Sequence, residues 1–406
     1  MNTLLIAATS AFLVLAPFPG SAGLRVSMLL LAALALLARG RELRAAFADL
    51  PRALVIAYGA WALLAIASLA WSVDPGYTRA ELKAELLYGA LAFLVFHVAG
   101  SLDVARWSTW WRAALAGTAA MALWFVIQEF LPFKILRQSM IEQRGPWSTH
   151  LVLVMPLLFA ASWPPPWGAR RGPLFQALAF GLLLTAAWQT GNRMMWIAFG
   201  AEIAIAMALT RSIAENGGAR ARTLQRFAIA AVAVVALAFA ASLIEHNEKF
   251  FGSQAPFATA FERDLRPRIW STALAQIGEA PWLGHGYGRE IVAGTFKPLT
   301  PPSYPELRHA HNVFLDVGVE LGGVGLVVFL GMLAALALAH ARFAGNAATA
   351  PLGVLGLALL AGFLVKNLTD DFMHRHNALV FWALNGMLLG LARAWSRPPP
   401  GEPGPR

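Results

Sequence analysis

Residues 308–320, "RHAHNVFLDVGVE", place two histidines and several ionisable or polar groups at the start of an apolar stretch. A histidine titrates near neutral pH, so either histidine of this stretch could serve as a general base. Three polar residues come after them at intervals of four, on one face of a helix: Asn312, Asp316 and Glu320. The stretch therefore predicts a helix whose first turn carries groups for proton transfer or ion pairing.

The two histidines have different neighbours in the chain. His311 stands directly before Asn312 at the expected start of the helix, which favours it as the general base. His309 has no such neighbour, and a structural role is the alternative there. A second pair, His374 and His376 in "HRH", is expected at the same end of the protein, so four histidines around a metal ion are an alternative. No carboxylate stands at a fixed ligand spacing, so we expect no metal; the role of the second pair stays open.

Three carboxylates lie inside apolar stretches, where a charged group is costly unless it is functional or paired with a cation. They are Asp316, Glu320 and Glu202. Arg308 or another loop arginine is a candidate partner for the first two. Glu202 is either a buried protonated carboxyl or part of an internal salt bridge, and the sequence leaves its role open.

Four arginines from three separate segments are expected at one surface. They are Arg144 in "EQRGPW", Arg193 in "GNRMMW", and Arg266 and Arg268 in "RPRIW". Guanidinium groups bind phosphate oxygens in bidentate fashion, so this convergence predicts a phosphate or diphosphate site. The chain has no glycine-rich nucleotide-binding loop, which favours a lipid diphosphate over a nucleotide. For Arg193 the alternative is a membrane anchor whose charged head reaches the lipid surface.

The amino-acid composition indicates that such a site belongs to a membrane protein. Of the 406 residues 58% are hydrophobic and only 13% are charged, which is typical of a protein with several membrane spans. The chain has no cysteine, and this excludes disulfides and thiol nucleophiles. The net charge of +10 is explained by arginines in cytoplasmic loops that contact lipid headgroups, so we expect no nucleic acid as a partner.

Apolar stretches of about 20 residues predict an all-α polytopic membrane protein with about twelve transmembrane helices. The expected spans are 3–19, 23–38, 52–71, 83–99, 107–131, 147–163, 173–190, 193–210, 226–244, 312–340, 351–368 and 377–394. The first two spans are short enough to form a hairpin. Arginine is more frequent in the loops on the side of the termini, so both termini are expected in the cytoplasm.

The predicted organisation has four parts. Spans one to nine occupy residues 1–244, and spans ten to twelve occupy 312–395. One large outer loop, 245–311, separates them and carries the site. Residues 396–406, "SRPPPGEPGPR", have the composition of a disordered cytoplasmic tail.

The large loop contains one amphipathic segment. Residues 267–277 are expected to form a short helix with Trp270 and Leu274 on its apolar side. A helix with tryptophan and arginine beside a bilayer is expected to lie at the membrane surface.

Four segments together resemble the O-antigen ligase and polymerase superfamily. They are "RGPWSTHLVLVMPLL", "GNRMMW", "RPRIW" followed by "APWLGHGYG", and "HAHNVFLDVGVELGGVG", and they cover about residues 140–330. The positions that match the family's landmarks are Arg144, Arg193, Arg266, His311, Glu320 and Gly322. One departure is "NRMMW", because small residues are more usual between that arginine and the tryptophan.

The resemblance implies an O-antigen ligase of the bacterial inner membrane with its site on the periplasmic face. The implied donor is a polysaccharide linked to undecaprenyl diphosphate, and the implied acceptor is a sugar hydroxyl of the lipid A core. His311 would take the hydroxyl proton in a direct, inverting displacement, while the arginines stabilise the departing diphosphate. No metal, nucleotide or other cofactor is implied.

Two alternatives remain at the level of the sequence. The same superfamily contains O-antigen polymerases and transferases that place oligosaccharides on proteins. A protein of a different class, a transporter of the same lipid-linked glycan, would favour repeat symmetry and a site at the middle of the membrane. The unusual charges here gather at one outer face, which favours the enzyme.

Overall fold

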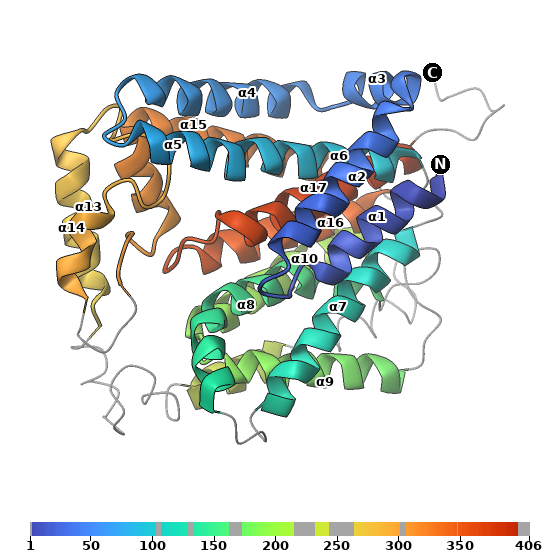
Figure 1. Cartoon of the computed structure of the whole chain (residues 1–406). Coiled ribbons are helices and arrows are strands. Elements are labelled where there is room, and N and C mark those ends of the chain that lie inside the picture. Colours follow the sequence, from blue (N-terminus) through green and yellow to red (C-terminus); the bar gives the residue numbers. More distant parts are fainter. Residues whose placement is uncertain are drawn as a thin grey trace.

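The computed structural model describes residues 2–102, 107–128, 134–161, 173–214, 232–242, 264–300, 306–346 and 348–396. Within these ranges the protein is all-helical and contains no strand, as predicted. Most of the long helices run side by side across the molecule (Figure 1). The predicted tail 396–406 lies outside the described residues except for its first position, as do parts of the predicted loop 245–311.

The N-terminal part is a series of apolar helices. They are α1 (Asn2–Leu15), α2 (Ala22–Leu37), α3 (Gly40–Ala48), α4 (Arg52–Ala67) with η1 (Ser68–Ala70), α5 (Pro75–Glu81), the π-helical η2 (Leu82–Leu87), α6 (Tyr88–Leu102) and α7 (Trp107–Gln128). α1 packs on α2 as the predicted hairpin, and α3 bends away from α2 by 101°. Pro75 at the first helical position and the Asp74 side chain, which accepts from the Tyr77 amide, start the continuous segment α5–η2–α6.

The remaining helices fall into two groups. The middle group is α8 (Lys134–Ala161), α9 (Pro173–Gln189), α10 (Arg193–Ala214) and an unlabelled helix, Val232–Ser242. The last group is α13 (Arg266–Glu279), α14 (Ala293–Phe296) with η5 (Lys297–Leu299), α15 (Val313–Ala344), α16 (Ala350–Lys366) and α17 (Arg375–Trp395). α13 confirms the amphipathic helix expected at 267–277, but Ile269, Ala273 and Gln276 form its buried face, whereas Leu274 is 58% exposed.

Each predicted span coincides with a helix of this series. Five described helices are long and apolar enough to cross a membrane, and the bent pair α2–α3 is a sixth candidate. The protein is therefore multi-pass, and the number of twelve spans stays a prediction.

The centre of the molecule is the pair α6 and α17, which pack along each other. Glycines make this close approach feasible, because a Cβ at Gly386 or Gly390 would meet the backbone oxygen of Phe93 or His97. Small residues four apart are the usual means by which helices approach within a membrane. α17 is accordingly the most enclosed of the spanning candidates.

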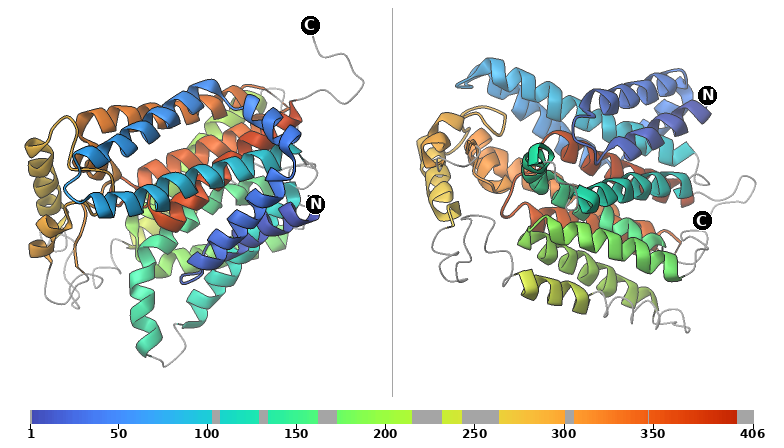
Figure 2. Two further views of the ribbon diagram at one scale, coloured as in Figure 1. Left: turned by 45° about the horizontal axis from the view of Figure 1, so that its top comes forward. Right: turned by 60° about the horizontal axis from the view of Figure 1, so that its bottom comes forward.

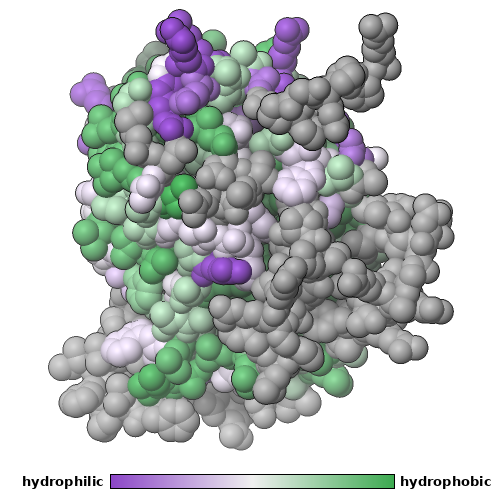
Figure 3. All heavy atoms as spheres, turned by 90° about the vertical axis from the view of Figure 1, so that its right-hand side faces the viewer, coloured by the Kyte–Doolittle hydropathy of each residue, from purple (hydrophilic) through white to green (hydrophobic). Residues whose placement is uncertain are grey.

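The helix ends divide the molecule into two poles. α13 and α14 stand at one pole, beside the start of α5 and α15, while α1 begins and α17 ends at the other (Figures 1 and 2). At this second pole hydrophilic side chains gather at the edge where α3 lies (Figure 3), with Arg41, Glu42 and Arg44 exposed. The first pole carries the loops in which the candidate site is expected.

The helix α15 is broken near that pole, at Gly322, whose φ of 64° and ψ of −162° are outside the helical range. The break was not predicted, since 312–340 was expected to be one regular span. The backbone groups of α15 that the break leaves without helical partners bind the loop before α14. The amides of His285 and Gly286 donate to the carbonyls of Val319 and Glu320. In the reverse direction the Gly323 and Val324 amides donate to the Pro281 and Trp282 carbonyls. The loop therefore replaces the hydrogen bonds that the break removes.

Glu202 lies fully buried between α10 and α16. A Cβ at Gly362 would overlap its carboxyl group, so the absence of a side chain at Gly362 provides the space. Neither carboxyl oxygen has a hydrogen-bond partner in the part of the chain that the structure describes. The alternative of an internal salt bridge therefore has no partner among these residues.

Candidate active site

The histidine–asparagine pair of the sequence is built into the first turn of α15. The Asn312 side-chain oxygen accepts hydrogen bonds from the amides of Phe314 and Leu315, at 2.9 and 3.2 Å, and so caps the helix. Its amide nitrogen donates to the Leu368 carbonyl at 2.8 Å, which ties α15 to the end of α16. His311 precedes this cap with a φ of 51°, a conformation that is rare for a residue with a side chain. Such strained positions concentrate at functional sites.

His311 faces a carboxylate from a distant part of the chain. Its Nδ1 lies 3.4 Å from Oδ1 of Asp370, and the other oxygen of Asp370 accepts from Nζ of Lys366 at 3.0 Å. The His311 side chain is 32% exposed, whereas that of Lys366 is completely buried. With Nδ1 donating to Asp370, the neutral ring presents an unprotonated Nε2 that can accept a proton.

Asp370 remains ionised in this arrangement. Burial alone would raise the pKa of this carboxyl, but the Lys366 ammonium and then His311 lower the pKa of Asp370 below its usual value. An ionised carboxylate can fix the tautomer of His311 and stabilise its protonated form.

His309 occupies a different environment from His311, although the two rings lie only 4.1 Å apart. Nδ1 of His309 accepts a hydrogen bond from the His311 amide at 3.1 Å and lies 3.3 Å from Oδ2 of Asp316. The other oxygen of Asp316 accepts a hydrogen bond from the Ala310 amide at 2.7 Å. Burial, and then the neighbouring His311, lower the pKa of His309 well below its ordinary value. His309 and Asp316 therefore support the backbone beneath His311.

Glu320 and Arg308 have structural partners. The Glu320 carboxylate accepts from the Gly288 amide at 2.9 Å and so anchors the glycine-rich loop to α15. The predicted pairing of Arg308 with Asp316 or Glu320 is wrong. Arg308 binds Glu290 and Glu306 at 3.0 and 3.1 Å instead, because its side chain is exposed whereas Asp316 and Glu320 are buried.

Cations from three helices form a connected electrostatic group that begins at Asp370, which Lys366 contacts. Arg193 and Arg266 are the first residues of α10 and α13, and Lys366 is the last residue of α16. The charge of Arg266 acts on both Arg193 and Lys366, so the three cations share one electrostatic environment. Arg266 is 34% exposed and is held by Asp264 at 3.0 Å, and Nε of Arg193 donates to the Ser242 carbonyl at 3.3 Å.

The positions of Arg144 and Arg268 are given by the helices that carry them, α8 and α13. Gly145, next to Arg144 on α8, approaches the ring of Phe372 closely enough that a Cβ would contact it at 2.9 Å. Phe372 comes two positions after Asp370, which places the Arg144 segment against the same turn. Arg268 lies on the exposed side of α13.

Asp370, Lys366 and the neighbouring Asp371 were not among the predicted site residues. The available signal was the run "KNLTDDF", in which a lysine and an aspartate four residues apart close an apolar helix at the same pole as the histidines.

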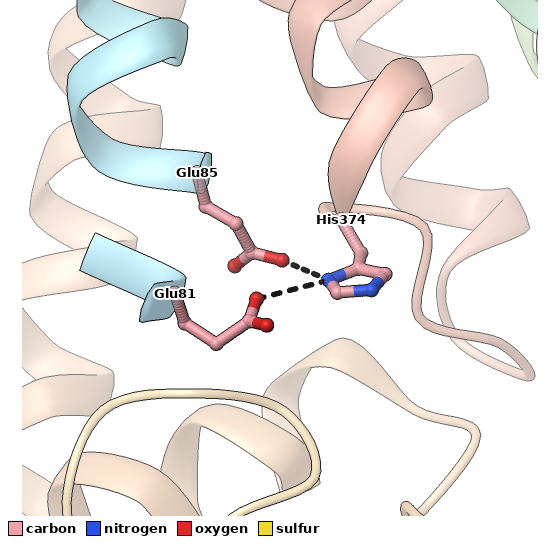
Figure 4. Close-up of side chains that lie close together, drawn as sticks. All are labelled: Glu81, Glu85 and His374. Carbon is pink, nitrogen blue, oxygen red and sulfur yellow. Dashed lines mark hydrogen bonds and ion pairs between the residues drawn. The ribbon is translucent and has the colours of Figure 1, made fainter. Parts of the chain in front are cut away.

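The second histidine pair is not joined to the first. His374 Nδ1 contacts Glu85 and lies 3.8 Å from Glu81 (Figure 4). Among the described residues these three form the one group of potential metal ligands within 4.8 Å, so the predicted alternative of four histidines around a metal does not describe their arrangement.

The hydrogen bonds of His374 indicate a structural contact with Glu81 and Glu85, called here the clamp of His374. Its Nε2 accepts from Nε of Arg375 at 2.7 Å, which assigns the proton of the neutral ring to Nδ1. A metal ion would need the Nδ1 lone pair, and a metal-bound histidine ordinarily donates from its other nitrogen. Burial and then Arg375 lower the pKa of His374 to about 3, so the ring is neutral. The clamp holds α5 and η2 against the turn that carries Asp370.

With this geometry established, comparisons with known proteins identify the relatives of the chain. Residues 178–330 match the family model described as O-Antigen ligase. The resemblance is confirmed. The matched segment contains Arg193, Arg266 and His311, while Lys366 and Asp370 lie beyond it.

A curated relative gives the same result over a longer range. An O-antigen ligase of Pseudomonas aeruginosa is 28% identical over 295 residues, which is 69% of this chain. The alignment spans 63% of the relative's own length.

Proposed function

We propose that the protein is an O-antigen ligase, a metal-independent inverting glycosyltransferase. It would move a polysaccharide from undecaprenyl diphosphate onto a sugar hydroxyl of the lipid A core. One observation carries the proposal: an accessible histidine contacts a half-buried carboxylate, Asp370, whose partner Lys366 is electrostatically coupled to an arginine at the start of another helix. A general base next to a cationic anion site is the arrangement that transfer from a diphosphate leaving group requires.

The proposed reaction is a single displacement. Nε2 of His311 removes the proton of the acceptor hydroxyl, whose oxygen bonds to the anomeric carbon from the face opposite the diphosphate. The bond from that carbon to the diphosphate oxygen breaks, and the electron pair leaves with the diphosphate. Asp370 stabilises the imidazolium, while Arg193 and Arg266 stabilise the charge on the leaving group.

Arg266 is suited to an exchangeable anion. Its guanidinium is held by Asp264 through one nitrogen at 3.0 Å, and no described residue binds the remaining donors of the planar fork, which could bind phosphate oxygens. Asp264 also accepts from the Arg266 amide at 2.9 Å, so the carboxylate keeps the side chain in place when no anion is bound.

The alternatives within the superfamily differ in the acceptor. A polymerase would use a second lipid-linked glycan, and a protein transferase would use a protein hydroxyl. A transporter of the lipid-linked glycan would carry out no chemistry. The grouping of His311 and the cations at one pole favours an enzyme, because transporters place their substrate sites near the middle of the membrane.

The acceptor can be tested directly. Purified protein is incubated in EDTA with lipid-linked glycan and one acceptor: lipid A core, a second lipid-linked glycan, or an acceptor protein. The proposal expects glycan on lipid A core only. Longer lipid-linked chains would favour the polymerase, and glycosylated protein the protein transferase. Relocation of the glycan without a new bond would favour the transporter, and activity restored only by added metal would contradict the metal-independent mechanism.

We further propose a location in the bacterial inner membrane, with both termini cytoplasmic and the site on the periplasmic face. The separation of the two poles supports this orientation (Figure 1). Reporters fused after Arg406 and after Gly217 should be cytoplasmic, and a reporter near Pro302 periplasmic. A periplasmic reporter at Gly217 would overturn the orientation.

A further inference from the structure

The loop Pro281–Trp282–Leu283, which joins α13 to the glycine-rich turn, exposes large apolar side chains at the pole of the site. Trp282 is 73% exposed and Leu283 is 44% exposed. Leu274 on the adjacent α13 is also exposed. We propose that this loop, called here the apolar loop, inserts into the lipid bilayer and anchors α13 to the membrane surface.

The apolar loop is continuous with helix surfaces that face lipid. The carbonyl of Trp282 accepts from the Val324 amide on α15, and the exposed side chains of α15 begin at that residue, with Val324 39% and Val327 70% exposed. Nε1 of Trp71, directly after η1, donates to the Leu283 carbonyl at 2.9 Å. The loop thus bridges two packed spanning segments, α15 and α4 with η1, at the ends of their exposed apolar faces.

The carbonyls of the apolar loop all have hydrogen-bond partners within the protein. Irregular backbone in contact with lipid requires partners for its polar groups, since hydrocarbon offers none. The four carbonyls from Ala280 to Leu283 all accept hydrogen bonds: from Gly284, Gly323, Val324 and Trp71 in that order. Pro281 has no amide hydrogen to satisfy.

The part of the same segment that follows α14 exposes polar rather than apolar side chains. Lys297 and Glu306 are 45% and 47% exposed and pair with each other at 3.5 Å, as expected for a surface in water. Trp282 and Leu283 therefore form an exposed apolar side of this segment, and the ion pair forms an exposed polar one. Tryptophan is the residue most typical of the boundary between hydrocarbon and headgroups, so the occupant of the apolar side is the lipid surface.

The test uses the absence of cysteine in the chain. Single variants Trp282→Cys, Leu283→Cys, Lys297→Cys and Val327→Cys are labelled with an environment-sensitive fluorophore and reconstituted into lipid nanodiscs. Val327 is the control for lipid contact, and Lys297 is the control for water. Two quenchers are compared: iodide in the water, and lipids brominated either near the headgroup or near the chain end.

We expect the labels at 282 and 283 to lose fluorescence emission in brominated lipid, and to lose more when the bromine is near the headgroup. Iodide should quench these two labels as little as it quenches the label at 327. The label at 297 should respond to iodide alone. If the labels at 282 and 283 respond to iodide as strongly as the label at 297 and not to brominated lipid, the proposal is wrong. Leu283→Cys keeps the test valid if Trp282→Cys fails to fold.

Discussion

The imidazole of His311 turns one nitrogen toward Asp370 and leaves the other for the acceptor. This pairing joins residues 59 positions apart, so its members could not be recognised as partners from spacing. The position of His311 beside a helix cap was predictable, because the cap is local in the sequence. Asp370 and Lys366 were missed, since a charged pair at the end of an apolar helix has the same sequence pattern as a loop.

The role of Asp370 predicts the effect of Asp370→Asn. An amide can offer its NH2 to Nδ1 of His311, which places the ring proton on Nε2 and removes the base. We expect the rate of transfer to fall by about 10²-fold or more, while donor binding is retained. The rate and the donor affinity are measured with purified protein. An unchanged rate would mean that Asp370 does not orient the base.

The raised pKa of Asp371 predicts that the stability of the folded protein depends on pH. Burial, and next the Asp316 carboxyl, raise the pKa of Asp371 from 3.8 to about 8. Between these values the folded protein holds a proton that the unfolded chain has released, so stability falls as pH rises. This contribution is complete below about pH 4 and lost above about pH 8.

Asp371→Asn should remove that part of the slope. The melting temperature in detergent is measured between the two pH values, for the wild type and the variant. A variant with the same decline as the wild type would show that another group causes it.

At the scale of elements, hydrogen bonds at the break in α15 connect the helix that carries the site to the glycine-rich loop. The sequence predicted helices well, because long apolar stretches have few other structures in a membrane. It did not predict the break at Gly322, since glycine is also common in regular spanning helices. The reason for the break lies in the partner loop at 281–286, whose backbone bonds to both sides of this glycine and is distant from it in the chain.

Gly322→Ala is therefore expected to destabilise the protein by about 1–3 kcal/mol. The φ of Gly322 is 64°, and a Cβ there would meet the backbone of Trp282. Gly331→Ala on the same helix is the matched control, because a Cβ at Gly331 meets nothing within 4 Å. Thermal unfolding in detergent should show a loss for the first variant and none for the second. Equal melting temperatures would contradict the proposed importance of the break.

At the scale of the whole molecule, segments far apart in the chain meet at one pole. The starts of α10, α13 and α15 and the turn between α16 and α17 supply the proposed base, its carboxylate and the cations. α6 and α17 form a rigid centre from which the turn with Asp370 projects, and the clamp of His374 fixes that turn. The resemblance pointed to the starts of α10, α13 and α15 but not to the turn with Asp370, and the meeting of these segments depends on tertiary packing.

The central claim is that His311 is the base that activates the acceptor. The most direct measurement is transfer of glycan from the lipid-linked donor to lipid A core by purified wild type, His311→Ala and His309→Ala at equal protein amounts. We expect His311→Ala to bind donor but to lose about 10²–10⁴-fold in rate, and His309→Ala to lose less. A normal rate for His311→Ala, or the reverse order of the two variants, would contradict the assignment of His311 as the base.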